Sequence, residues 1–292
     1  MNPIDLHMHS CFSTDGQYTP EELVKMCKER GMTHMAIADH NSVKAVLALQ
    51  GKELGIKLIP AIEIDCSYKG VDFHLLGYGI DAQSVAFEVI EEQAMSQEIK
   101  HSDRRLQFAR ETLGLQMEDE DIEAVKVMGV LTAEAIMEVC LKDERNKNHL
   151  VMQPYYEGGE RSDNPMVNFY WDYYSQGKPG YTKIQWPELK DMVNTIHQKG
   201  GIAVLAHPGN NLKGKEELLE GIVQCGIDGL EVYSSYHKAE QIAFYEKKAK
   251  KYGLLMTCGS DFHGKTKPAI GLGQCDCSEE VQQKLMEQLK KM

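Results

Sequence analysis

The sequence has no long hydrophobic run. Its most apolar stretches, such as residues 202–206, are far shorter than the roughly 20 residues that a helix needs to cross a bilayer. The first ten residues, MNPIDLHMHS, include Asp5 and lack the charged and apolar regions of a signal peptide. We therefore expect a cytoplasmic protein that has no membrane partner.

Closely spaced cysteine pairs are also scarce. None of the eight cysteines forms a CxxC motif, and Cys275 and Cys277 are the only close pair. A cytoplasmic chain of 292 residues is long enough to bury a hydrophobic core without disulfides. We expect reduced thiols and no cysteine-based metal site.

Basic residues are in deficit. Lys and Arg number 32 against 44 Asp and Glu, which gives a net charge of −12. Sequence-independent binding to duplex nucleic acid depends on Lys and Arg that displace counterions. We therefore expect no binding to long duplexes, whereas a small anionic substrate stays compatible with the sequence because bound divalent cations can reverse the local field.

Apolar strand patterns alternate with helical patterns at both ends of the chain. Strands are expected at residues 4–9, 35–38, 56–64, 71–78, 202–206, 229–233 and 254–258, and helices at 19–31, 43–54, 188–199, 215–225, 238–252 and 279–290. Between them, residues 93–182 read as helices and loops with 16 acidic and 10 basic residues. The alternation predicts parallel βαβ units, so the sequence indicates one α/β domain with a helical insertion.

Side chains that can bind metals follow the expected strands. His7 and His9 alternate along the first strand, so both imidazoles point the same way and can reach one ion. At the ends of later strands, or near them, lie Asp15, Asp39, His40, Glu63, His74, His207, Asp261 and His263. The carboxyl ends of parallel strands carry the active site in α/β barrels, so we expect these residues to converge.

A single buried His is more often structural than a ligand, and one HxH motif also arises by chance. The prediction therefore depends on five strand ends that each deliver His, Asp or Glu. Four other histidines follow no such pattern and are read as surface or structural residues: His34, His101, His149 and His197. Imidazoles mixed with carboxylates favour Zn, Mn or Fe.

The ordered motifs HxH, ADHNS, a strand-end Glu, FHLLGYGID, LAHPG, LEVY and GSDFHG resemble those of the PHP (polymerase and histidinol phosphatase) superfamily. The resemblance covers about residues 1–92 and 183–292 and is strongest to bacterial phosphoesterases that remove phosphate from nucleotides, some of which are 5′-to-3′ exoribonucleases on short RNA. It implies a distorted (β/α)7 barrel formed by residues 1–92 and 183–292, with residues 93–182 as a helical cap.

The resemblance also implies a site of two or three divalent metals. Carried over by position, His7, His9, Glu63 and Asp261 hold one metal, and Glu63 bridges to a second held by His74 and His207. Asp15, His40 and His263 hold the third. The expected substrate is a small phosphorylated molecule, such as a nucleotide, a nucleoside bisphosphate or a short single-stranded oligonucleotide.

The expected chemistry is hydrolysis of a phosphate monoester by hydroxide generated on the metals. Glu63 is predicted to be catalytic through its bridging role. His237 is predicted to bind phosphate or protonate the leaving oxygen, with a solvent-exposed residue at a helix start as the alternative. Arg104 and Arg105, near Lys100 and Arg110, are predicted to meet an extra phosphate, with a solvated helix face as the alternative.

Three other interpretations of the function remain open. An amidohydrolase also begins with HxH, but its metals are commonly bridged by a carboxylated Lys, where Glu63 stands here. A histidinol-phosphate phosphatase does not require the insertion, and a non-catalytic PHP module would have lost ligands. In two places the chain departs from its relatives: Ala61-Ile62 replaces Gly-Val, and residues 130–132 replace an Arg-Pro-His segment.

Overall fold

Eight strands form two sheets in the computed structural model, which describes residues 3–275 and 277–289. The first sheet is parallel and has the order β1 (Ile4–Met8), β2 (His34–Ile37), β3 (Lys57–Leu58). The second has the order β4 (Ala61–Tyr68), β5 (Val71–Tyr78), β6 (Ile202–Leu205), β7 (Gly229–Ser234), β8 (Leu255–Gly259). Strands β4, β5 and β6 pair antiparallel, and β6, β7 and β8 pair parallel. The predicted mixed α/β class is confirmed.

Two isolated bridges link the sheets. Met8 at the end of β1 pairs with Phe262 just after β8, and His40 after β2 pairs with Glu63 on β4. Backbone hydrogen bonds at both places, from His9 N to Phe262 O and from Asn41 N to Glu63 O, support the pairing. The links bring strand ends that are distant in sequence to one place.

The strand expected at residues 56–64 is two strands in different sheets. Pro60 separates β3 from β4, because proline has no N–H and cannot donate to a ladder. Glu63 therefore lies near the start of β4, beside the end of β2, and not at the end of a third parallel strand.

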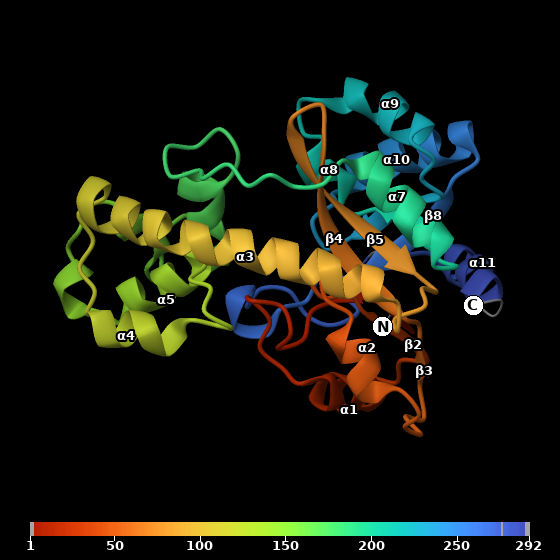
Figure 1. Ribbon diagram of the computed structural model, residues 1–292, viewed down its shortest axis with the longest axis horizontal. Coiled ribbons are helices and arrows are strands. Elements are labelled where there is room, and N and C mark those ends of the chain that lie inside the picture. Colours follow the sequence, from red (N-terminus) through yellow and green to blue (C-terminus); the bar gives the residue numbers. More distant parts are fainter. Residues whose placement is uncertain (1–2, 276, 290–292) are drawn as a thin grey trace.

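Eleven α-helices, counted over the described residues, surround the sheets or build the insertion (Figure 1). Those around the sheets are α1 (Pro20–Glu29), α2 (Lys44–Leu49), α7 (Leu189–Gln198), α8 (Pro208–Asn211), α9 (Leu219–Gln224), α10 (Ala239–Tyr252) and α11 (Glu279–Leu289). Those of the insertion are α3 (Val85–Gln107), α4 (Asp119–Val125), α5 (Ala133–Lys142) and α6 (Pro165–Phe169). Residues 1–2, 276 and 290–292, which the predicted domain and final helix include, lie outside the described residues.

The insertion has a core of its own. A cluster that includes Ala109, Ile136, Met152 and Phe169 is built from residues 106–174 alone, whereas the sheets pack around a separate, larger cluster. Helix α3 begins on the sheets and extends into the lobe of α4 and α5 (Figure 1), so the predicted boundary at residue 93 falls inside this helix.

Among the described residues, no helix combines the length and apolar character that a membrane span requires. The eight cysteines, all of them described, form no disulfide.

Candidate metal centre

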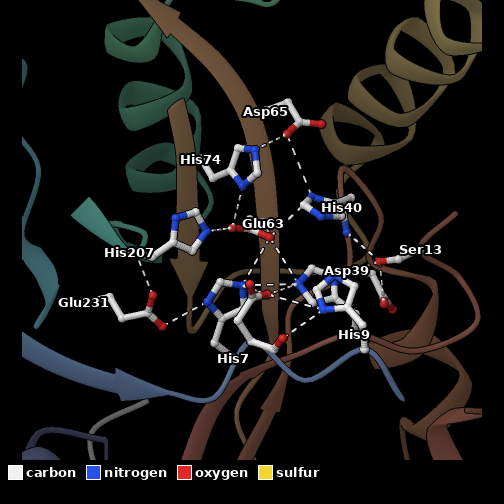
Figure 2. Close-up of polar contacts among 12 residues, drawn as sticks. His7, His9, Ser13, Asp39, His40, Glu63, Asp65, His74, His207 and Glu231 are labelled. Carbon is white, nitrogen blue, oxygen red and sulfur yellow. Dashed lines mark hydrogen bonds and ion pairs between the residues drawn. The ribbon is translucent and has the colours of Figure 1, made fainter. Parts of the chain in front are cut away.

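The nine residues predicted as ligands converge on one place. Figure 2 shows six of them close together: His7, His9, His40, Glu63, His74 and His207. Five of the nine also line a cavity: Asp15, His40, His74, His207 and Asp261. The nine residues come from β1 and the loop that follows it, the ends of β2, β6 and β8, and the hairpin of β4 and β5: His7, His9, Asp15, His40, Glu63, His74, His207, Asp261 and His263. The structure therefore brings together every residue of that predicted set.

The carboxylate of Glu63 lies at the centre. Its Oε2 is 3.1 Å from His7 Nε2, 3.2 Å from His9 Nε2 and 3.3 Å from His40 Nδ1. Asp261 Oδ1 approaches the same two imidazoles of β1, at 3.3 Å from His7 and 3.1 Å from His9. One oxygen of Glu63 thus faces the first group of donors.

The other oxygen of Glu63 faces a second group. Its Oε1 is 3.1 Å from His74 Nδ1 and 3.2 Å from His207 Nε2. Because Glu63 is fully buried and its two oxygens face different imidazoles, its geometry is that of a bridging carboxylate.

Hydrogen bonds on the far side of the rings fix which nitrogens face the centre. Glu231 Oε1 is 2.9 Å from His7 Nδ1, and a carboxylate only accepts, so Nδ1 carries the proton. Ser13 donates to Asp39, which leaves its Oγ to accept from His9 Nδ1 at 2.9 Å. In this tautomer, both Nε2 atoms present a lone pair to the centre.

The same logic applies to two other rings. His207 Nδ1 lies 2.7 Å from Asn211 Oδ1, and His263 Nδ1 lies 2.9 Å from the Asp261 carbonyl. Their Nε2 lone pairs face Glu63 and Asp15, the latter at 3.1 Å. Lone pairs that face carboxylate oxygens repel each other unless a cation lies between them.

Several buried atoms of this cluster lack a hydrogen bond: Asp15 Oδ1, His40 Nδ1, Glu63 Oε2 and His263 Nε2. Buried polar atoms are nearly always paired, so this concentration of unpaired atoms requires an explanation. The donor set of imidazole nitrogens and carboxylate oxygens fits divalent Zn, Mn or Fe. Three sets of donor atoms lie close enough together to hold an ion: His7, His9, Glu63 and Asp261; His9, Asp15, His40 and His263; and His40, Glu63 and His74.

The pKa shifts of the cluster also show that its carboxylates stabilise positive charge nearby. Burial lowers the pKa of His9, but hydrogen bonds and charge from Asp261 and Glu63 outweigh it and raise the pKa to about 9. Burial likewise opposes a charged Glu63, yet His7 and His74 hold the pKa of that carboxyl well below its usual range. Either protons on the imidazoles or divalent cations can supply this positive charge.

The backbone is strained where it presents the ligands. Asn41, His207 and Asp261 have positive φ angles of 56°, 24° and 57°, a region that non-glycine residues rarely adopt. Strain of this kind concentrates at functional sites. Gly259 is required for a different reason, since a Cβ there would lie 2.2 Å from the Cβ of His7.

The cluster opens into a cavity of about 590 Å³, a size typical of small-molecule sites. The insertion contributes Glu134, Tyr170 and Trp171 to the lining, and Lys213 also lines the cavity. Burial, with a smaller contribution from Asp15, raises the pKa of Glu134 to about 7.

The structure does not bring the other predicted site residues into contact with the cluster. His237 is buried, its Nδ1 donates to Val232 O, and its Nε2 accepts from Gly209 N at 2.9 Å, so neither nitrogen is available. Arg105 lines the cavity but pairs with Glu98, and Arg104 is exposed and is not part of the lining. The role predicted for His237 has no geometric support.

Sequence reasoning missed the residues that support the ligands. Glu231 lies in the quoted motif LEVY, and Asp65 follows Glu63 at the spacing that places both on one face of β4. Asp65 is directly opposite His74 in the hairpin register and 3.2 Å from its Nε2. Tyr236 and Lys267, both in contact with Asp261, had no signal in the sequence.

The chain is similar to known proteins. The sequence model of the PHP domain matches residues 5–151. A 3′,5′-nucleoside bisphosphate phosphatase of Chromobacterium violaceum is 30% identical over 90% of this chain and 88% of its own. A 5′-3′ exoribonuclease of Escherichia coli is 29% identical over 92% of this chain and 88% of its own. A solved structure from Bifidobacterium adolescentis, inferred to be a metal-dependent phosphoesterase, has a TM-score of 0.75 and 25% identity, and covers 97% of this chain and 95% of its own.

Proposed function

Because the chain belongs to the PHP domain family, we propose that it is a metal-dependent phosphoesterase that hydrolyses a phosphate monoester of a small phosphorylated compound. The observation that carries the proposal is the convergence of imidazole lone pairs and carboxylate oxygens on Glu63, next to a cavity of about 590 Å³ that His74 and His207 line. When bound, divalent cations lower the pKa of water to about 7 and screen the charge of a phosphate.

The proposed site holds two or three ions of Mn, Fe or Zn. His7, His9, Glu63 and Asp261 hold the first, and Glu63 with His74 and His207 holds the second. Asp15, His40 and His263 hold the third, and His9 also lies within reach of that group. Glu63 would help to hold both ions of the pair. Glu231 keeps His7 in the tautomer whose Nε2 lone pair can bind a metal.

The two sheets are proposed to form the distorted seven-unit barrel, with residues 1–92 and 183–292 as the catalytic part. The bridges Met8–Phe262 and His40–Glu63 support this arrangement, since they join the end of β1 to the segment after β8 and the segment after β2 to β4. The separate core of the insertion supports its assignment as a cap, with α3 as the shared helix.

The substrate is proposed to be a nucleotide, a nucleoside bisphosphate or the end of a short oligonucleotide. Aromatic rings of Tyr170, Trp171, Tyr181 and Trp186 line the cavity and offer flat surfaces to a base. At the position of the Arg-Pro-His segment of relatives, Val130 and Leu131 are buried and Thr132 caps α5, so this segment supplies no cation.

A phosphate-release panel tests the proposal. With manganese present, we expect kcat/KM for a nucleoside bisphosphate, a mononucleotide or a short 5′-phosphorylated RNA to exceed that for internal cleavage of a long duplex at least about 100-fold. The net charge of −12 and the capped cavity both disfavour the duplex.

Other members of the panel separate the alternatives. A preference for histidinol phosphate indicates the histidinol-phosphate reading, and failure on every ester despite bound metal indicates a non-catalytic module. A duplex cleaved internally as efficiently as the small substrates contradicts the capped-site proposal.

A further inference from the structure

A buried lysine lies beside the cluster and has no role in the function proposed so far. Lys267 is 7% exposed, and its Nζ is 2.6 Å from Asp261 Oδ2. Lysine is almost never fully buried unless it is paired. Within the described parts of the chain, no other Lys or Arg forms an ion pair with the nine predicted ligands.

A tyrosine fixes this lysine in place. Tyr236 Oη donates to the same Asp261 oxygen at 2.6 Å, and Lys267 Nζ lies 5.4 Å from the centre of the Tyr236 ring. The two donors occupy Oδ2, which leaves Oδ1 to face His7 and His9. Both residues line the cavity, and an ammonium group has three N–H donors, of which the contact with Asp261 uses one.

The charge of the site explains why a lysine is needed there. Asp15, Glu63, Asp65 and Asp261 contribute four negative charges. Two divalent cations leave the site neutral before a phosphate dianion enters, and three leave an excess of two charges that the dianion cancels. In both cases a positive side chain lowers the electrostatic cost of binding the dianion. Arg105 also lines the cavity but is paired with Glu98, and of the lysines that line it only Lys267 forms an ion pair with a predicted ligand in the described part of the chain.

We propose that Lys267 is a phosphate-binding catalytic residue. Its ammonium group binds a non-bridging oxygen of the substrate's phosphate and stabilises the negative charge that grows there in the transition state. Tyr236 is a positioning residue: it contacts both Lys267 and Asp261 and keeps the ammonium group beside the carboxylate. This inference depends on the proposed function for its substrate, but it concerns a tetrahedral dianion that can be tested alone.

The test uses inorganic phosphate as the probe and the metal-loaded full-length protein. In Lys267→Met, calorimetry is expected to show phosphate binding weakened about 10- to 100-fold, because a charged hydrogen bond is lost. We expect kcat/KM to fall about 100-fold, while elemental analysis shows unchanged metal content. Lys267→Arg should recover most of the phosphate affinity, since it keeps the charge.

Two further variants keep the inference testable. Lys267→Gln retains a donor to Asp261 without charge, so it should show the same loss even if the Met variant does not fold. Lys265→Met is the matched control, since Lys265 lies on the same short turn but pairs with Glu138 and does not line the cavity, so its loss should change phosphate affinity less than about fivefold.

Unchanged phosphate affinity in both uncharged variants would overturn the inference. So would loss of metal with normal phosphate affinity in the fraction that stays loaded, because Lys267 would then only hold Asp261. A wild-type protein that binds phosphate through Lys267 but hydrolyses nothing in the panel would refute the proposed function and leave the binding role of Lys267 supported.

Discussion

Glu63→Gln is expected to lower kcat/KM for the best substrate about 10³-fold. Gln keeps the size of the side chain but has an NH2 group in place of one of the two carboxylate oxygens, and this group cannot bind a metal. The loss corresponds to about 4 kcal/mol of transition-state stabilisation, within the range that a metal ion supplies. The measurement is steady-state phosphate release under saturating manganese.

Glu91→Gln is the matched control for this variant. Glu91 lines the same cavity but pairs with Lys44, outside the cluster, so its loss should leave activity within a few-fold of wild type. Thermal unfolding of the Glu63 variant should stay cooperative, since the shape of the side chain is kept. Near-normal turnover with bound metal would show that Glu63 is not the bridge.

Glu231→Gln is expected to weaken metal binding about 10- to 100-fold, although Glu231 is not itself a proposed ligand. Its carboxylate accepts from His7 Nδ1 and from the backbone N–H of His207, at 2.9 and 2.8 Å. A Gln amide can accept only one of these, and its NH2 group favours the tautomer of His7 that places a proton on Nε2. Metal affinity is measured by competition with a chromophoric chelator.

The control here is Glu246→Gln. Glu246 lies on α10, outside the cluster. Its carboxylate accepts a hydrogen bond from the Oη of Tyr233, which is on β7 like Glu231. Its substitution should leave metal affinity unchanged. Equal affinities for the Glu231 variant and wild type would show that the tautomer of His7 does not depend on Glu231.

The sequence predicts the convergence of the candidate ligands because their spacing follows backbone geometry. His7 and His9 are two residues apart on a strand, and the loops after parallel strands meet on one side, so neither inference needs side-chain packing. The class of fold follows from the same alternation of strands and helices. Glu63 is correctly grouped although its strand is misplaced, because β4 begins beside the end of β2.

The supporting residues depend on contacts between distant segments, which no local pattern reveals. Lys267 meets Asp261 through a short helical turn at Gly264–Thr266, and from the middle of β7 Glu231 reaches the ring of His7 and the backbone N–H of His207. His237 shows the opposite error: its position near a strand end suggested chemistry, but two backbone groups occupy its nitrogens. Burial and hydrogen-bond partners decide whether such a residue takes part in the site, and neither follows from a local sequence pattern.

The most direct test of the account is the number of metal ions bound per chain, measured together with activity. Protein purified without chelator and reconstituted with manganese should contain at least two equivalents of Mn, Fe or Zn in total by elemental analysis. Phosphate release should rise with the second equivalent, because the proposed centre has donor atoms for an ion on each side of Glu63. One equivalent or less at full activity would contradict the multinuclear centre on which the proposed function depends.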